Sequence, residues 1–187
     1  MRFVVVYDAC VLYPAPLRDF LIRLARTGLF SAKWTDDIQE EWIRSLSARR
    51  PEIAESLQRT RALMEQAVPD CLVHGYEPLV HALDLPDPND RHVLAAAIRS
   101  GAQAIITFNL RDFPESRLEP FDLEALHPDA FVEQQLDLGE GAVLRAAKEA
   151  RAALRNPEVD PAIYIDTLEK HGLVVTAQRL REFSHLI

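Results

Sequence analysis

The sequence has few of the residues that mark several common protein classes. The two cysteines, Cys10 and Cys71, form no disulfide framework and no metal-ligand spacing, so we expect both to be small buried residues. No apolar run approaches the roughly 18 residues that a membrane-spanning helix needs. The opening segment has too short an apolar run and too early an acid for a signal peptide. We therefore expect a cytoplasmic protein with no membrane association.

Positive charge and glycine-rich loops are also scarce. A net charge of -8 argues against a protein held to nucleic acid by bulk electrostatics. It leaves room for local basic patches, and for an enzyme whose acids are neutralised by bound cations. The six glycines are scattered, so the chain has no phosphate-cradling loop. The six histidines have no metal-binding spacing, and His92 is expected to face solvent or a partner.

Short strand-like runs, the first of them rich in β-branched residues, alternate with helical patterns over the first part of the chain. This alternation predicts parallel strand pairing in an α/β sandwich. Strands are predicted at residues 2–8, 29–34, 71–74, 103–108 and 123–126, and helices at 17–28, 35–46, 52–67, 77–83, 89–100 and 128–135. After Gly139 the pattern is helical throughout, so we predict one domain at residues 1–138 and a helical C-terminal extension at 139–187.

Two acids follow buried strands, at the edge where α/β sheets place their ligand sites. Asp8 ends the first strand, where a dry, unpaired carboxylate is costly and needs a cation, hydrogen-bond donors or water. Asp112 lies in the loop after the strand at 103–108, although Asp is also a common turn residue. Phe113 is expected to pin this loop to the core.

Asp90 is the most informative acid, because it falls on the apolar face of its predicted helix. At about 100° per residue, Val93, Leu94 and Ala97 lie within about 60° of it. The first turn of a helix stabilises a carboxylate through free N–H groups and the helix dipole. A simple capping role is the alternative, but Asp87 or Asn89 can supply the cap and leave Asp90 free.

An acidic pair lies in the helix predicted at 35–46. Glu41 flanks the face formed by Ile38 and Trp42, whereas Glu40 points away from it. Glu41 is therefore the member of the pair that we expect to enter a site. The alternative is that both acids are solvated.

Each of these acids has a simple structural explanation, but together they share a functional one. If their oxygens converge where the strands end, they supply the hard ligands that Mg²⁺ and Mn²⁺ prefer. Such ions activate water and neutralise a phosphoryl group during in-line attack. Because clustered carboxylates repel one another, the metal-free site should show raised pKa values.

Four segments resemble the successive motifs of PIN-domain ribonucleases, most closely the VapC-like toxins of toxin–antitoxin modules. They are VYDACVLYP, WTDDIQEEW, DPNDRHVLAAA and IITFNLRDFP, in this order within roughly residues 2–135. The resemblance implies a three-layer α/β/α fold with a central parallel sheet of four to five strands, followed by C-terminal helices. It also implies an Mg²⁺- or Mn²⁺-dependent endoribonuclease.

Carried over residue by residue, the resemblance implies a set of catalytic and metal-binding acids. The first three are Asp8, Glu41 and Asp90. Asn109 stands where many relatives have an acid, so Asp112 is the predicted fourth ligand, with Thr107 and Asn109 in support. Arg44, at the basic end of its helix, is the predicted contact for RNA phosphates, although a helix C-terminus favours cations in any case.

The resemblance further implies an RNA substrate, a cognate antitoxin protein and a homodimer. An antitoxin segment would act by inserting a cationic side chain among the acids and displacing the metal. One alternative is a catalytically idle PIN-fold binding module, which metal-dependent RNA cleavage would distinguish. Another is a Mg²⁺-dependent phosphatase of the haloacid dehalogenase type. That enzyme needs a second Asp two residues after the first, where this chain has Cys10.

Overall fold

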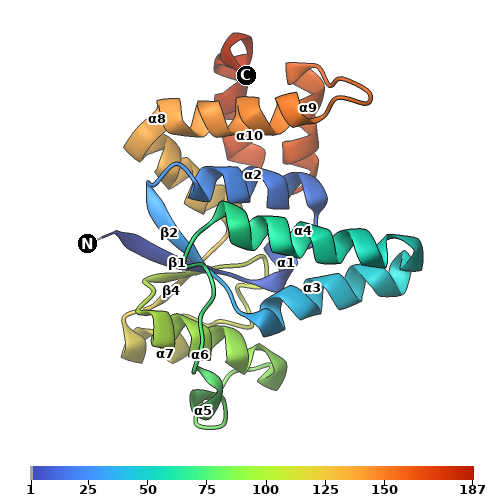
Figure 1. Cartoon of the computed structure of the whole chain (residues 1–187). Helices are drawn as coiled ribbons and strands as arrows, with labels where there is room; N and C mark the ends of the chain where they lie inside the picture. The colour runs from blue at the N-terminus through green and yellow to red at the C-terminus, as the bar shows by residue number, and fades with distance from the viewer. Residues whose placement is uncertain (1) are drawn as a thin grey trace. The chain divides into compact units, whose positions relative to one another are not determined.

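The computed structural model describes residues 2–187 and divides into two compact units (Figure 1). The sheet unit comprises the residues up to Tyr13 together with Phe30–His127. The helical unit comprises Pro14–Leu29 and Pro128–Ile187. The predicted boundary between residues 138 and 139 falls within the helical unit's longest helix, and the division of the chain into domains stays a prediction.

The sheet unit is built on four parallel strands in the order β2-β1-β3-β4. The strands are β1 (Phe3–Tyr7), β2 (Phe30–Lys33), β3 (Ala104–Ile106) and β4 (Glu124–Leu126). The predicted parallel sheet of four to five strands is therefore confirmed. The strand expected near 71–74 is reduced to an isolated parallel bridge between Trp34 and Leu72.

Helices flank this sheet in a three-layer α/β/α arrangement. Figure 1 shows α6 and α7 on one side of the strands and α3 and α4 on the other, and α6 packs on β1 and β3. The α-helices are α1 (Ala9–Leu12), α3 (Asp36–Arg49), α4 (Ala54–Ala67), α5 (Glu77–Val80), α6 (Arg91–Ser100) and α7 (Glu115–Leu118). Three 3-10 turns join them: η1 (Pro51–Ile53), η2 (Pro88–Asp90) and η3 (Glu119–Phe121). The sequence did not predict α7, because four residues are too few to show a helical period.

The start of α6 differs from the predicted start at Asn89. Residues Pro88–Asp90 form a tight turn that the Arg91 N–H closes on the Pro88 carbonyl. Asp87 caps this turn, since its Oδ1 accepts the Asn89 N–H at 2.8 Å. Asp90 occupies the N-cap position of α6, yet its side chain makes no capping hydrogen bond. Asp87 therefore caps the turn, and the Asp90 carboxylate is not used for capping.

Small side chains let α6 lie close to the sheet. Ala95, Ala96 and Ala97 are all fully buried, as are Val5 and Val6 on β1. The left-handed conformation of Gly101, at φ 64°, then ends the helix. This close packing fixes where the first turn of α6, and with it Asp90, stands relative to the strand ends.

The helical unit contains α2 and all of the C-terminal helices. Its elements are α2 (Ala15–Ala25), α8 (Pro128–Ala153), α9 (Pro161–Lys170), α10 (Val174–Glu182) and the 3-10 turn η4 (Ser184–Leu186). The helix predicted at 128–135 continues as α8 through a kink at Gly139, where a Cβ would lie 2.8 Å from a methyl carbon of Leu29. None of the helices in residues 2–187 is long and apolar enough to cross a membrane.

We predict that Ala96→Leu destabilises the protein by about 1–3 kcal/mol, because Ala96 is fully buried and the added carbons have no free space in the packing around α6. Urea unfolding followed by circular dichroism measures the effect. The control is Arg99→Leu on the exposed side of the same helix, which should change stability by less than about 0.5 kcal/mol. Equal effects of the two variants would contradict the packing argument.

Candidate metal-binding acidic site

Asp8 stands at the carboxyl end of β1 and is only 3% exposed. Its Oδ1 accepts the Ala9 N–H at 2.7 Å, and its Oδ2 accepts the Thr107 hydroxyl at 2.7 Å. Burial raises the pKa of Asp8, these donors lower it, and the Glu41 carboxylate raises it again. The cost of a buried carboxylate is thus met in part by hydrogen-bond donors, which also fix its orientation.

A small hydrogen-bond network joins the end of β1 to the loop after β3. The Thr107 hydroxyl, which donates to Asp8, also accepts the Asn109 N–H at 2.9 Å. The Cys10 thiol donates to Asp8 Oδ2 at 3.1 Å, and its sulfur accepts the Phe108 N–H at 3.3 Å. Cys10 was expected to be only a small buried residue. It is partly exposed and takes part in the site, and the sequence signal for this was its position two residues after Asp8.

The carboxyl group of Asp90 also has a raised pKa. Its pKa is raised to about 7, first by burial and then by the carboxylates of Asp8, Asp87, Asp112 and Glu41. The other three acids that the sequence nominated, Asp8, Glu41 and Asp112, are therefore all close enough to influence Asp90. The raised values expected for clustered carboxylates are found at Asp90 and Asp8.

Glu41 on α3 contacts His92, whose orientation was predicted wrongly from the sequence. His92 was expected to face solvent or a partner, but its side chain is only 17% exposed and its Nε2 lies 3.3 Å from Glu41 Oε2. The helical projection failed because it treats α6 alone, whereas α3 supplies the partner. Glu40 is exposed, as the same projection of α3 predicted.

Asp112 lies in the loop that follows β3. Its N–H donates to the Asn109 carbonyl at 3.0 Å, so the loop closes on itself. The side chain of Phe113 is 2% exposed, which confirms that it anchors the loop in the core. This anchoring keeps the Asp112 carboxylate near Asp90, whose pKa it helps to raise.

The donor set suits a hard divalent cation. Carboxylate and hydroxyl oxygens are the ligands that Mg²⁺ and Mn²⁺ prefer, and mutual repulsion of the carboxylates is relieved by a bound cation. As the side chains stand, residues 2–187 contain no group of three or more His, Cys, Asp or Glu side chains arranged to hold a metal ion. The chemistry of the residues fits such an ion, and the ligand assignments stay predictions.

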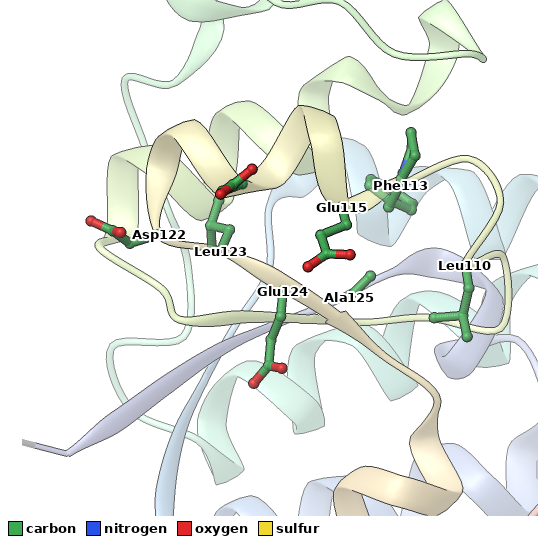
Figure 2. Close-up of a pocket in the computed structure, with 9 residues that line it drawn as sticks. Leu110, Phe113, Glu115, Asp122, Leu123, Glu124 and Ala125 are labelled. Carbon is green, nitrogen blue, oxygen red and sulfur yellow. The ribbon is translucent and has the colours of Figure 1, made fainter.

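Two further features of the sheet unit bear on RNA binding: an exposed arginine and a separate hollow. Arg44 is exposed on α3, in the turn after Glu41. A separate hollow along β4 has a volume of about 490 Å³. Figure 2 shows its lining residues, among them Glu115, Glu124, Asp122 and Leu110. It includes none of the four predicted acids. Its carboxylates repel phosphate, so this hollow is a poor place for RNA.

Comparison with known proteins gives two family matches along the chain. A PIN-domain model matches residues 4–111, and a model described as the VapC50 C-terminal domain matches residues 128–182. A protein of Mycobacterium tuberculosis described as "Putative ribonuclease VapC50" is 38% identical over 109 residues. That match covers 58% of this chain and 64% of the relative, less than two thirds of its length. No solved structure matches the chain.

The raised pKa of Asp90 predicts how the metal-free protein responds to pH. Asp90 ionises near pH 4 when unfolded and near pH 7 when folded, so the folded state holds the extra proton between these values. Stability is therefore lost as the pH rises through this window. In EDTA at pH 8, Asp90→Asn should be more stable than wild type by on the order of 1 kcal/mol, allowing for solvent screening of a half-buried group.

Urea unfolding at pH 8 and pH 4 measures this difference. At pH 4 the stability gain should disappear, because Asp90 is then protonated in the folded wild type. Adding Mn²⁺ at pH 8 should stabilise wild type more than the variant. A gain of the same size at both pH values would show that ionisation of Asp90 is not its cause.

Proposed function

Because the chain belongs to the PIN-domain family, we propose that it is an Mg²⁺- or Mn²⁺-dependent endoribonuclease that hydrolyses RNA phosphodiester bonds. The observation that supports this most directly is the cluster of carboxylates at the carboxyl ends of β1 and β3, in which the pKa of Asp90 rises to about 7. Repulsion among these carboxylates destabilises the fold and contributes nothing to its stability. In a site for divalent cations the same carboxylates attract the bound ion, which offsets their repulsion.

In this proposal the cation is held by the acids that the sequence nominated. They are Asp8, Glu41, Asp90 and Asp112. Thr107 and Asn109 support them, since Thr107 donates to Asp8 and accepts from the Asn109 backbone. When bound, the metal would lower the pKa of a water and neutralise charge on the phosphoryl group.

In this proposal, other residues of the chain orient the metal ligands and position the RNA. The Ala9 N–H and the Thr107 hydroxyl each donate a hydrogen bond to one oxygen of Asp8, so the orientation of this carboxylate is already fixed without a ligand. Phe113 anchors the loop that carries Asp112. Arg44, exposed on α3, would contact an RNA phosphate outside the acidic cluster and so align the strand.

We further propose that the protein is the toxin of a toxin–antitoxin pair, acts in the cytoplasm and forms a homodimer. The match of residues 128–182 to a domain named for VapC50 supports the toxin assignment. The antitoxin would neutralise the site by placing a cationic side chain among the acids. A complex that keeps full nuclease activity would argue against this mode of inhibition. The idle binding module stays the alternative.

The acidic residues give the main test of the nuclease. Asp8→Asn and Asp90→Asn should each reduce Mn²⁺-dependent cleavage of single-stranded RNA at least about 100-fold, because each removes a metal-binding charge. Glu41→Gln should reduce cleavage less, since the Glu41 side chain is 38% exposed whereas Asp8 is buried. A fluorescence assay with and without EDTA measures the rates, and circular dichroism checks that each variant is folded.

Glu40→Gln is the matched control for Glu41→Gln, because it removes the same charge from the next residue of α3, which is exposed. It should cleave RNA at nearly the wild-type rate. No Mn²⁺ binding and no cleavage by wild type would favour the idle binding module. Wild-type cleavage in EDTA would contradict metal dependence.

Arg44→Ala tests the phosphate contact separately from the chemistry. The variant should raise KM by about 3- to 10-fold at low salt while kcat changes little, because the contact is made in the ground state and the transition state alike. The difference from wild type should shrink as KCl is raised. Arg59→Ala, an exposed residue on α4, is the control. A loss confined to kcat would remove Arg44 from this role.

A further inference from the structure

His92 contacts Glu41 from a different segment of the chain. The Nε2 of His92 donates a hydrogen bond to Glu41 Oε2, at a distance of 3.3 Å. The imidazole is 17% exposed, and its Nδ1 is buried without a hydrogen-bond partner in the part of the chain that the structure describes. A buried imidazole nitrogen without a hydrogen-bond partner destabilises the folded state, so the position of His92 beside Glu41 is not explained by stability alone.

Glu41 is the candidate ligand that most needs an external support. Its side chain is 38% exposed and extends from the second turn of α3, with three rotatable bonds. By contrast, Asp8 is short, buried and held by backbone and side-chain donors. The negative charge on Asp8 repels the Glu41 carboxylate. Without a donor on the side of α6, Glu41 would gain both entropy and electrostatic relief by turning to solvent.

We propose that His92 is a positioning residue that holds Glu41 in the acidic site, so that α6 orients the ligand from α3 next to the ligand Asp90 at its own N-cap. This inference rests on the proposed function, because it concerns the same metal site. It predicts that His92 acts on metal affinity only through Glu41. Residues that orient metal ligands in this way typically contribute about 10- to 100-fold to metal affinity or activity.

The test is Mn²⁺ binding by isothermal titration calorimetry on full-length protein without RNA. His92→Leu fills a similar volume but cannot donate, so its Kd for Mn²⁺ should rise at least about 10-fold. His92→Gln keeps an N–H donor and should stay within about 3-fold of wild type. The control is His81→Leu, which changes an exposed histidine in the same unit and should leave the Kd unchanged. Should His92→Leu fail to fold, His92→Ala takes its place.

A double-mutant cycle separates positioning from a general structural role. In a Glu41→Gln background, where the carboxylate is absent, His92→Leu should weaken Mn²⁺ binding by less than about 2-fold. A loss as large as in wild type would overturn the proposal, as would wild-type affinity in His92→Leu. If wild type itself binds no Mn²⁺, the proposed nuclease falls together with this inference. If wild type binds Mn²⁺ and His92→Leu binds it with the same affinity, the inference about His92 is wrong and the proposed nuclease is unaffected.

Discussion

The site depends on one buried carboxylate, Asp8, held where two parallel strands end. β1 and β3 pair side by side, so Asp8 and Thr107, the residues that directly follow these strands, meet at the same edge of the sheet. Thr107 and the Ala9 N–H orient Asp8 and lower its pKa, against the larger effect of burial, which raises it. Every other feature of the site is arranged around this fixed carboxyl group, because each further acid lies close to it.

The cluster therefore stores unfavourable electrostatic energy that packing must offset. The anchored Phe113 and the tightly packed alanines of α6 hold Asp112 and Asp90 near Asp8 despite their repulsion. Sites of this kind are locally destabilised. In the proposed nuclease a bound cation would offset this repulsion, so closer approach of α6 to the strands would lower the stability of the metal-free sheet unit and raise its affinity for metal.

Much of this could be predicted from the sequence because it depends on local pattern. Buried apolar runs rich in β-branched residues predicted β1 and β3, and the polar residues that follow them marked the functional edge of the sheet. The angular position of Asp90 identified it as the inward-facing acid. Asp87 and Asn89 were the two candidates for the cap, and in the structure Asp87 caps the turn that leads into α6. The exposed position of Glu40 and the anchoring of Phe113 follow from the same periodicity and apolarity.

The sequence by itself determined the alternation of strands and helices, the edge at which the acids gather and which acid of each pair faces inward. These properties follow from backbone period and side-chain polarity, which act within a few residues. Only the tertiary structure decided that His92 meets Glu41, that Thr107 donates a hydrogen bond to Asp8, and that α2 packs with α8. Such contacts join residues on different elements or on different turns of the chain. Their free energy depends on how those elements pack, which no local pattern encodes.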